Sequence, residues 1–122
     1  MEAGLELLSQ AAGPSRKWAC LGDMLEMGIE EERLHRALAA KISALGIGQV
    51  LLYGPRMASL ADELRKNGFS GHVEHFETQS DLGAALLREA KPGDSILIKG
   101  SRGMRMEEVW KMLESHARSH WN

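Results

Sequence analysis

One short loop of the sequence concentrates residue types that bind anions: Lys99, Gly100, Ser101, Arg102 and Gly103. Its two glycines allow the backbone to approach a ligand closely, and its cationic and hydroxyl side chains can donate hydrogen bonds to a carboxylate or a phosphate. A helix is expected directly after the loop, and the free N–H groups at a helix N-terminus attract anions. The loop is therefore predicted to bind an anionic ligand; the alternative is a solvated loop whose serine caps the helix.

Two further candidate sites lie in other loops. Asp23 and Glu26 fall in the glycine-bounded segment 22–28, where two carboxylates could contact a metal-bound nucleotide or a basic partner. A capping aspartate and a solvated glutamate are the equally weighted alternative. Arg56 follows a Gly-Pro pair and could reach the same crevice, although such an arginine is more often simply exposed.

The five histidines do not predict a metal centre. His72 and His75 are three residues apart on an expected strand, so their side chains should point to opposite faces. His116 and His120 could share a helix face, but no third ligand is near them in the sequence. His35 is expected on the polar flank of its helix, either exposed or bonded to a neighbouring carboxylate.

Nucleophilic catalysis finds no support either, because no Ser-His-Asp or Cys-His arrangement can be proposed. The single cysteine, Cys20, falls in an apolar run and is expected to be an inert core thiol. The G-x-x-x-x-G-K-[ST] order of a Walker phosphate loop is absent. The sequence therefore predicts no catalytic residue and no metal ligand.

Helix and strand patterns alternate along the chain and must position these residues. The clearest helix has one apolar stripe formed by Leu34, Leu38, Ile42 and Leu45. Short apolar runs predict strands at residues 17–21, 49–53, 72–76 and 95–98. Helices are predicted at residues 1–12 and 30–45, between Pro55 and Gly68, between Thr78 and Lys91, and at residues 104–117.

This order predicts an α/β fold with a Rossmann-like, open, mostly parallel sheet and helices on both faces, because strands separated by helices pair in parallel through right-handed crossovers. A chain of 122 residues is expected to form one domain, residues 1–122. Ligands of such sheets bind beyond the carboxyl ends of the strands. The segments 22–28, 53–57 and 99–104 are expected at that edge.

Composition excludes several functional classes. Fifteen lysines and arginines against 17 acidic residues give a net charge of −2, which argues against nucleic acid or an anionic membrane as a partner. No apolar stretch approaches the roughly 20 residues that a membrane span needs. One cysteine suits a reducing compartment, so a cytoplasmic protein is expected.

Two segments carry a family resemblance. Residues 21–28 (LGDMLEMG), with residues 31–35 behind them, and residues 98–107 (IKGSRGMRME) resemble motifs of the ATP-dependent Mur ligase family of peptidoglycan synthesis, in its branch that adds D-alanyl-D-alanine. The resemblance covers nearly the whole chain, but only the last, Rossmann-like domain of the three that these ligases have. It therefore implies that the chain is the C-terminal domain of a three-domain enzyme.

The same resemblance implies that the first strands of this domain are missing. The family motif Asp-x-Tyr-Asn-Ala-Asn-Pro should precede the segment that matches residues 1–8, and it is absent. The chain is therefore expected to be a fragment whose sheet has one unprotected edge, where the missing strands would pair.

The reaction that the resemblance implies has two steps. ATP phosphorylates the terminal carboxylate of UDP-N-acetylmuramoyl-tripeptide, and the amine of D-alanyl-D-alanine then attacks the acyl phosphate. The last domain would position the dipeptide and close over ATP. ATP and magnesium would bind mainly outside this chain, so the isolated domain is expected to be inactive.

Site residues follow from the matched motifs. The late motif implies dipeptide-carboxylate contacts for Lys99, Gly100, Ser101 and Arg102. Pro55-Arg56 match part of a substrate-binding loop of a related ligase, which implies a substrate contact for Arg56. Asp23 and His35 fall in the first motif and would contact the nucleotide or another domain. The alternative reading is a free-standing α/β module that binds a small anion without ligase activity.

Overall fold

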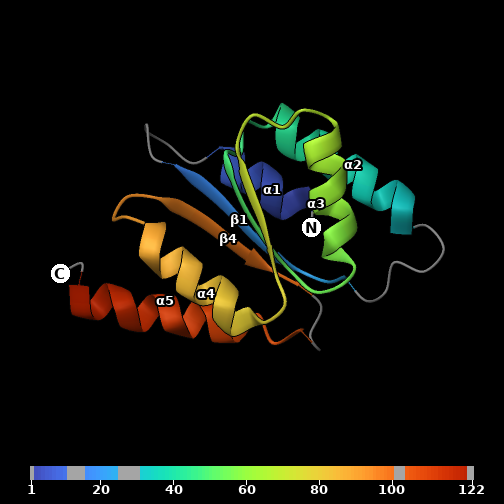
Figure 1. The fold of residues 1–122 in the computed structure, drawn as a ribbon. Helices are drawn as coiled ribbons and strands as arrows, with labels where there is room; N and C mark the ends of the chain where they lie inside the picture. Colours follow the sequence, from blue (N-terminus) through green and yellow to red (C-terminus); the bar gives the residue numbers. More distant parts are fainter. Residues whose placement is uncertain (1, 11–15, 25–30, 101–103, 121–122) are drawn as a thin grey trace.

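The computed structural model describes residues 2–10, 16–24, 31–100 and 104–120 (Figure 1). Helices and strands alternate in the predicted order: α1 (Glu2–Ser9), β1 (Lys17–Gly22), α2 (Glu31–Ala44), β2 (Gln49–Tyr53), α3 (Met57–Lys66), β3 (His72–Phe76), α4 (Gln79–Glu89), β4 (Ser95–Lys99) and α5 (Glu107–His120). None of the helices in these ranges is long and apolar enough to cross a membrane.

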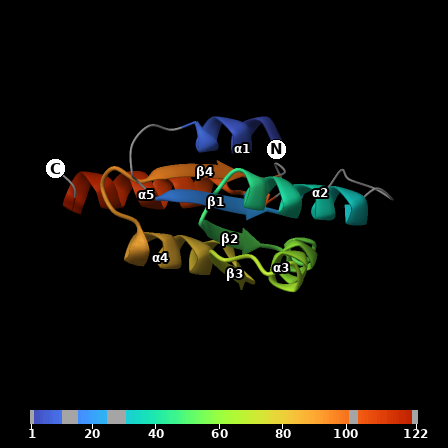
Figure 2. The same cartoon turned by 90° about the horizontal axis from the view of Figure 1, so that it is seen from above.

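The four strands form one parallel sheet in the order β3-β2-β1-β4 (Figure 2). Their register aligns the strand ends, because Gly22 pairs with Tyr53 and Tyr53 pairs with Phe76. Lys99, at the end of β4, pairs with Leu21 of β1. The predicted fold class is confirmed, and the carboxyl ends of all four strands meet at one edge.

Helices cover both faces of this sheet, as predicted. α1, α2 and α3 lie on one face, and α4 and α5 lie on the other (Figure 1). The alternation of side chains along β1 serves both layers: Ala19 and Leu21 pack against the first group of helices, and Trp18 and Cys20 against the second. The sheet is therefore held between two apolar layers, each made of buried side chains.

The two outer strands differ in how their edges are protected. β3 exposes His72 and Glu74, and Arg65 of α3 donates a hydrogen bond to the carbonyl of Val73 at 3.5 Å. β4 is apolar between its end residues and only half-buried, and within the described ranges it pairs with β1 alone. Charged side chains discourage pairing at an edge. The edge that fits the expected unprotected one is therefore that of β4.

Candidate functional site

The ends of β1 and β4 touch through two glycines at the carboxyl edge. A β-carbon on Gly100 would lie 2.8 Å from Cγ of Met106 and 3.2 Å from Cα of Gly22. A β-carbon on Gly22 would lie 2.9 Å from Sδ of Met106. A side chain on Gly100 would be opposed by the backbone of Gly22 as well as by Met106, which precedes α5, whereas one on Gly22 would require the side chain of Met106 to shift.

Lys99 is the residue of the predicted anion loop whose side chain the structure places. It is exposed at the end of β4, at the edge where the ligands of open parallel sheets bind. Gly100 follows and is half-buried by the contacts just described. Ser101 and Arg102 lie outside the described residues, so their predicted role in ligand binding stays a prediction.

Asp23 caps a helix that begins 34 residues later in the chain. Its side chain is buried at 1% exposure, and its two carboxylate oxygens accept hydrogen bonds from the backbone N–H groups of Met57 at 2.9 Å and Arg56 at 3.2 Å. A carboxylate at a helix N-terminus satisfies free N–H groups and meets the positive end of the helix dipole. This geometry favours the capping alternative, whereas the predicted contact with a nucleotide or another domain stays a prediction that the burial of Asp23 disfavours.

Gly54 makes the turn between β2 and α3 possible. Its φ is +108°, and a β-carbon there would fall on the carboxylate of Asp23. Its N–H donates to the carbonyl of Phe76 at 3.4 Å, and its own carbonyl lies 2.6 Å from Nε2 of His75. Because a carbonyl can only accept, Nε2 of His75 carries the proton. Residues from both neighbouring strands therefore hold this turn.

Arg56 is exposed at the end of this turn, as the N-cap residue of α3. It follows β2, and Lys99 ends β4; β1 lies between these two strands. Adjacent strands are about 4.8 Å apart, so the ends of β2 and β4 are about 10 Å apart. The carboxyl edge thus presents two cationic side chains, one after each of the strands that flank β1.

His35 does not lie where the sequence analysis expected it. Its side chain is only 2% exposed, and neither ring nitrogen has a hydrogen-bond partner among the described residues. It shares the inner face of α2 with Leu38, Ala39 and Ile42, which follow it by three, four and seven positions. The predicted stripe is confirmed at Leu38 and Ile42, whereas Leu34 is only half-buried and His35 takes its place on the inner face. The prediction of an exposed or carboxylate-bonded His35 is therefore wrong.

Cys20 and the two histidines of α5 are also placed by the structure. Burial raises the pKa of the Cys20 thiol to about 12, which fits the predicted inert core thiol. His116 and His120 stack with ring centroids 4.2 Å apart on α5. No cluster of three or more metal-ligating side chains occurs in the ranges that the structure describes.

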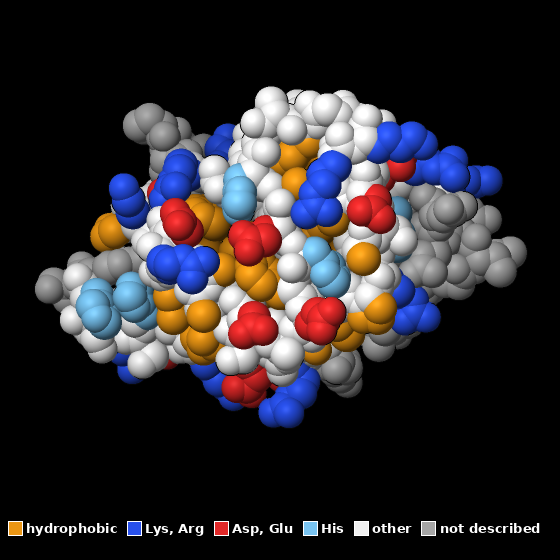
Figure 3. Space-filling model, in the orientation of Figure 1, with side chains coloured by type: hydrophobic (Ala, Val, Ile, Leu, Met, Phe, Trp, Pro, Cys, Tyr) orange, Lys and Arg blue, Asp and Glu red, His pale blue; other side chains and the backbone are white. Residues whose placement is uncertain are grey.

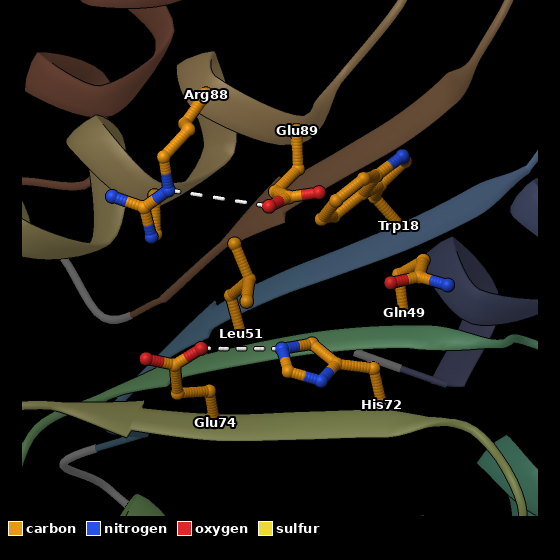
Figure 4. Close-up of a pocket in the computed structure, with 8 residues that line it drawn as sticks. Trp18, Gln49, Leu51, His72, Glu74, Arg88 and Glu89 are labelled. Atoms are coloured by element: carbon orange, nitrogen blue, oxygen red, sulfur yellow. Dashed lines mark hydrogen bonds and ion pairs between the residues drawn. The ribbon is translucent and has the colours of Figure 1, made fainter.

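A groove of about 270 Å³ lies at the opposite, amino end of the strands, between α4 and β3. Figure 4 shows Arg88 and Glu89 on one wall, His72 and Glu74 on the other, and Leu51 between them. Each wall pairs its own charges, at 3.1 Å for His72–Glu74 and 4.0 Å for Arg88–Glu89. None of the predicted site residues lines this groove, so it is separate from the candidate site.

The face that carries this groove has charges of both signs. In Figure 3, lysine and arginine side chains alternate with acidic ones, and hydrophobic side chains are visible between them. Mixed charges of this kind agree with the net charge of −2.

Comparisons with known proteins agree with the fold and the motifs. The family described as "Mur ligase, glutamate ligase domain" matches residues 1–102. UDP-N-acetylmuramoyl-tripeptide–D-alanyl-D-alanine ligase of Bacillus subtilis (strain 168) is 39% identical over 113 residues, which are 93% of this chain and 25% of that protein. The enzyme of the same name from Escherichia coli (strain K12) is 31% identical over 118 residues, 95% of this chain and 24% of that protein.

The fold has a counterpart among solved structures. The crystal structure of MurF ligase from Thermotoga maritima in complex with ADP superposes with a TM-score of 0.73 at 22% sequence identity, covering 94% of this chain and 25% of that one. At this identity the likeness shows the fold alone. The chain spans about a quarter of the length of the relatives that it matches.

Proposed function

Because this chain belongs to the Mur ligase family, we propose that residues 1–122 are the C-terminal domain of an ATP-dependent, three-domain ligase that joins D-alanyl-D-alanine to UDP-N-acetylmuramoyl-tripeptide in peptidoglycan synthesis. The observation that carries this proposal is the 39% identity with the Bacillus subtilis ligase over 93% of the chain. The proposed location is the cytoplasm.

The proposed role of this domain is to hold the incoming dipeptide. Lys99 and Arg56 present positive charge at the carboxyl edge, where Gly100, Ser101 and Arg102 would complete the contact with the dipeptide carboxylate. With its carboxylate held there, the dipeptide amine would be directed toward the acyl phosphate.

ATP and its magnesium are assigned mainly to the rest of the ligase. The chain covers a quarter of its relatives and lacks the Walker order of residues, so its own residues do not supply a phosphate loop. ATP supplies the phosphoryl group that activates the tripeptide carboxylate. The contribution of this domain would be orientation of the dipeptide and, on closure, exclusion of water. The isolated chain is accordingly expected to be inactive.

An amide NMR titration of the chain with D-alanyl-D-alanine tests this role, with L-alanyl-L-alanine as the control. We expect shifts confined to residues 99–104 and Arg56 that are larger with the D,D dipeptide, at millimolar concentrations or higher. Equal shifts with both dipeptides would favour the free-standing anion-binding module. An absence of shifts at these residues would contradict a preformed dipeptide site on this domain.

A further inference from the structure

We propose that His75 is a positioning residue, which fixes the turn that presents Arg56 to the dipeptide by holding the carbonyl of Gly54. Nε2 of His75 lies 2.6 Å from that carbonyl oxygen. The inference rests on the proposed function, because the position of Arg56 matters for binding only if this edge of the sheet holds the dipeptide.

The turn before α3 has one internal hydrogen bond, from the N–H of Met57 to the carbonyl of Gly54 at 3.2 Å, and is further held by groups outside it. Gly54 has a φ of +108°, a conformation that suits the most flexible residue type. Arg56 is the N-cap residue of α3, and its own side chain makes no capping hydrogen bond. Asp23 supplies one restraint through the N–H groups of Arg56 and Met57. The carbonyl of Gly54, at the other end of the turn, is the group that His75 holds.

The place of His75 in the sheet supports a role beyond packing. Side chains alternate along β3, so His75 lies on the same face as Val73, which packs against the apolar core beneath α3. A histidine there places a donor against the turn, and Nε2 donates both in the neutral tautomer assigned above and in the protonated ring.

The consequence for binding is preorganisation. A turn held at both ends keeps the backbone of Arg56 in one position before the ligand arrives, so less conformational freedom is lost on binding. Removing one neutral hydrogen bond of this kind should weaken dipeptide binding by about threefold to tenfold.

The experiment compares His75→Leu with His75→Gln, because glutamine can still donate to the Gly54 carbonyl and leucine cannot. Each variant chain is titrated with D-alanyl-D-alanine and followed by the amide signals of Gly54, Arg56 and Met57. We expect His75→Leu to shift these signals without ligand and to weaken binding about threefold to tenfold, and His75→Gln to stay within about twofold of the original chain.

His72→Leu is the matched control, because it makes the same change three residues earlier on β3. His72 lines the groove beside α4 and pairs with Glu74, far from the turn in register. It should leave both dipeptide affinity and the signals of the turn unchanged. If His75→Leu does not fold, His75→Asn replaces it, since that amide is too short to reach the carbonyl.

The outcomes separate this inference from the proposed function. The positioning role is overturned if His75→Leu binds the dipeptide with the affinity of the original chain, or if His75→Gln loses as much affinity as His75→Leu. In either case the proposed function still stands when Arg56→Ala weakens binding. If Arg56→Ala leaves binding unchanged, Arg56 is no ligand of the dipeptide. The proposed contact then fails, and the role of His75 fails with it.

Discussion

Asp23 shows at the scale of single residues how a motif residue can act through the backbone. Both of its oxygens are taken by the first N–H groups of α3, and its side chain is buried. Because its hydrogen bonds hold the backbone of Arg56 and Met57, Asp23 would affect ligand binding only through the position of Arg56. This helix cap therefore links Asp23, at the end of β1, to Arg56, the proposed dipeptide contact at the start of α3.

Replacing Asp23 by asparagine should lower the free energy of unfolding by about 1–2 kcal/mol, because the amide nitrogen cannot accept the second hydrogen bond. Urea unfolding followed by circular dichroism measures this loss. Asp62→Asn is the control, since that carboxylate lies on α3 with 82% of its side chain exposed. An equal effect of both changes would contradict the capping role.

His35 is a buried polar residue whose ring nitrogens lack partners in the described part of the chain. An unsatisfied buried group costs about 1–3 kcal/mol, which an apolar residue of similar size avoids. His35→Leu should therefore raise the midpoint of urea unfolding. A lower midpoint would mean that the imidazole has a partner and is part of a stabilising contact.

The elements of the fold follow from the sequence more completely than the contacts between them. The expected strand at residues 17–21 is observed as Lys17–Gly22, and the helix expected after Thr78 begins at Gln79, where the Thr78 hydroxyl accepts from the N–H of Asp81 at 3.0 Å. Both features depend on local patterns of apolar and hydroxyl side chains. Such patterns are visible in a short window of sequence.

The contacts of the site depend on residues distant in the chain, and the sequence did not predict them. Asp23 meets α3 across 34 residues, and His75 meets Gly54 across 21. Only the order β3-β2-β1 of the sheet brings these residues together. His35 differs for another reason: Leu38 and Ile42 define the buried face of α2, and either Leu34 or His35 can extend that face by one turn. The structure places His35 inward and leaves Leu34 half-buried.

Asp94 links the amino ends of β1 and β4 and gives the stability a pH dependence. Burial alone would raise the pKa of this carboxyl group, but hydrogen bonds from the N–H of Lys91 and the indole of Trp18, and the charge of Arg16, outweigh it and lower the pKa. A carboxyl group whose pKa is lowered on folding stabilises the fold above its unfolded value, and this stabilisation is lost as the pH falls.

Stability should therefore decrease as the pH is lowered below about 4, the ordinary value for aspartate. Asp94→Asn should be less stable at pH 7 and should show a weaker loss below that pH. Thermal unfolding of both chains between pH 3 and pH 7 measures the difference. If the unfolding temperatures of the two chains fall in parallel as the pH is lowered, Asp94 does not contribute to the pH dependence of stability.

At the scale of the whole molecule, the two edges of the sheet differ in charge. Each outer strand has one partner in the described ranges, but β3 carries His72 and Glu74 whereas β4 is apolar between its end residues. α1 packs over β4, where a β-carbon on Gly4 would contact Leu97. A further strand that paired with β4 and led into α1 would reach β1 by a right-handed crossover.

The most direct test of the central claim is a ligase assay on a chimera. The 113 aligned residues of the Bacillus subtilis ligase are replaced by the matching residues of this chain. Consumption of UDP-N-acetylmuramoyl-tripeptide is then measured with D-alanyl-D-alanine and, as a control, with L-alanyl-L-alanine. We expect ligation of D-alanyl-D-alanine, and a loss of about tenfold or more in kcat/KM for the dipeptide with Lys99→Ala. A folded chimera that still activates the tripeptide with ATP but does not join D-alanyl-D-alanine to it would contradict the account.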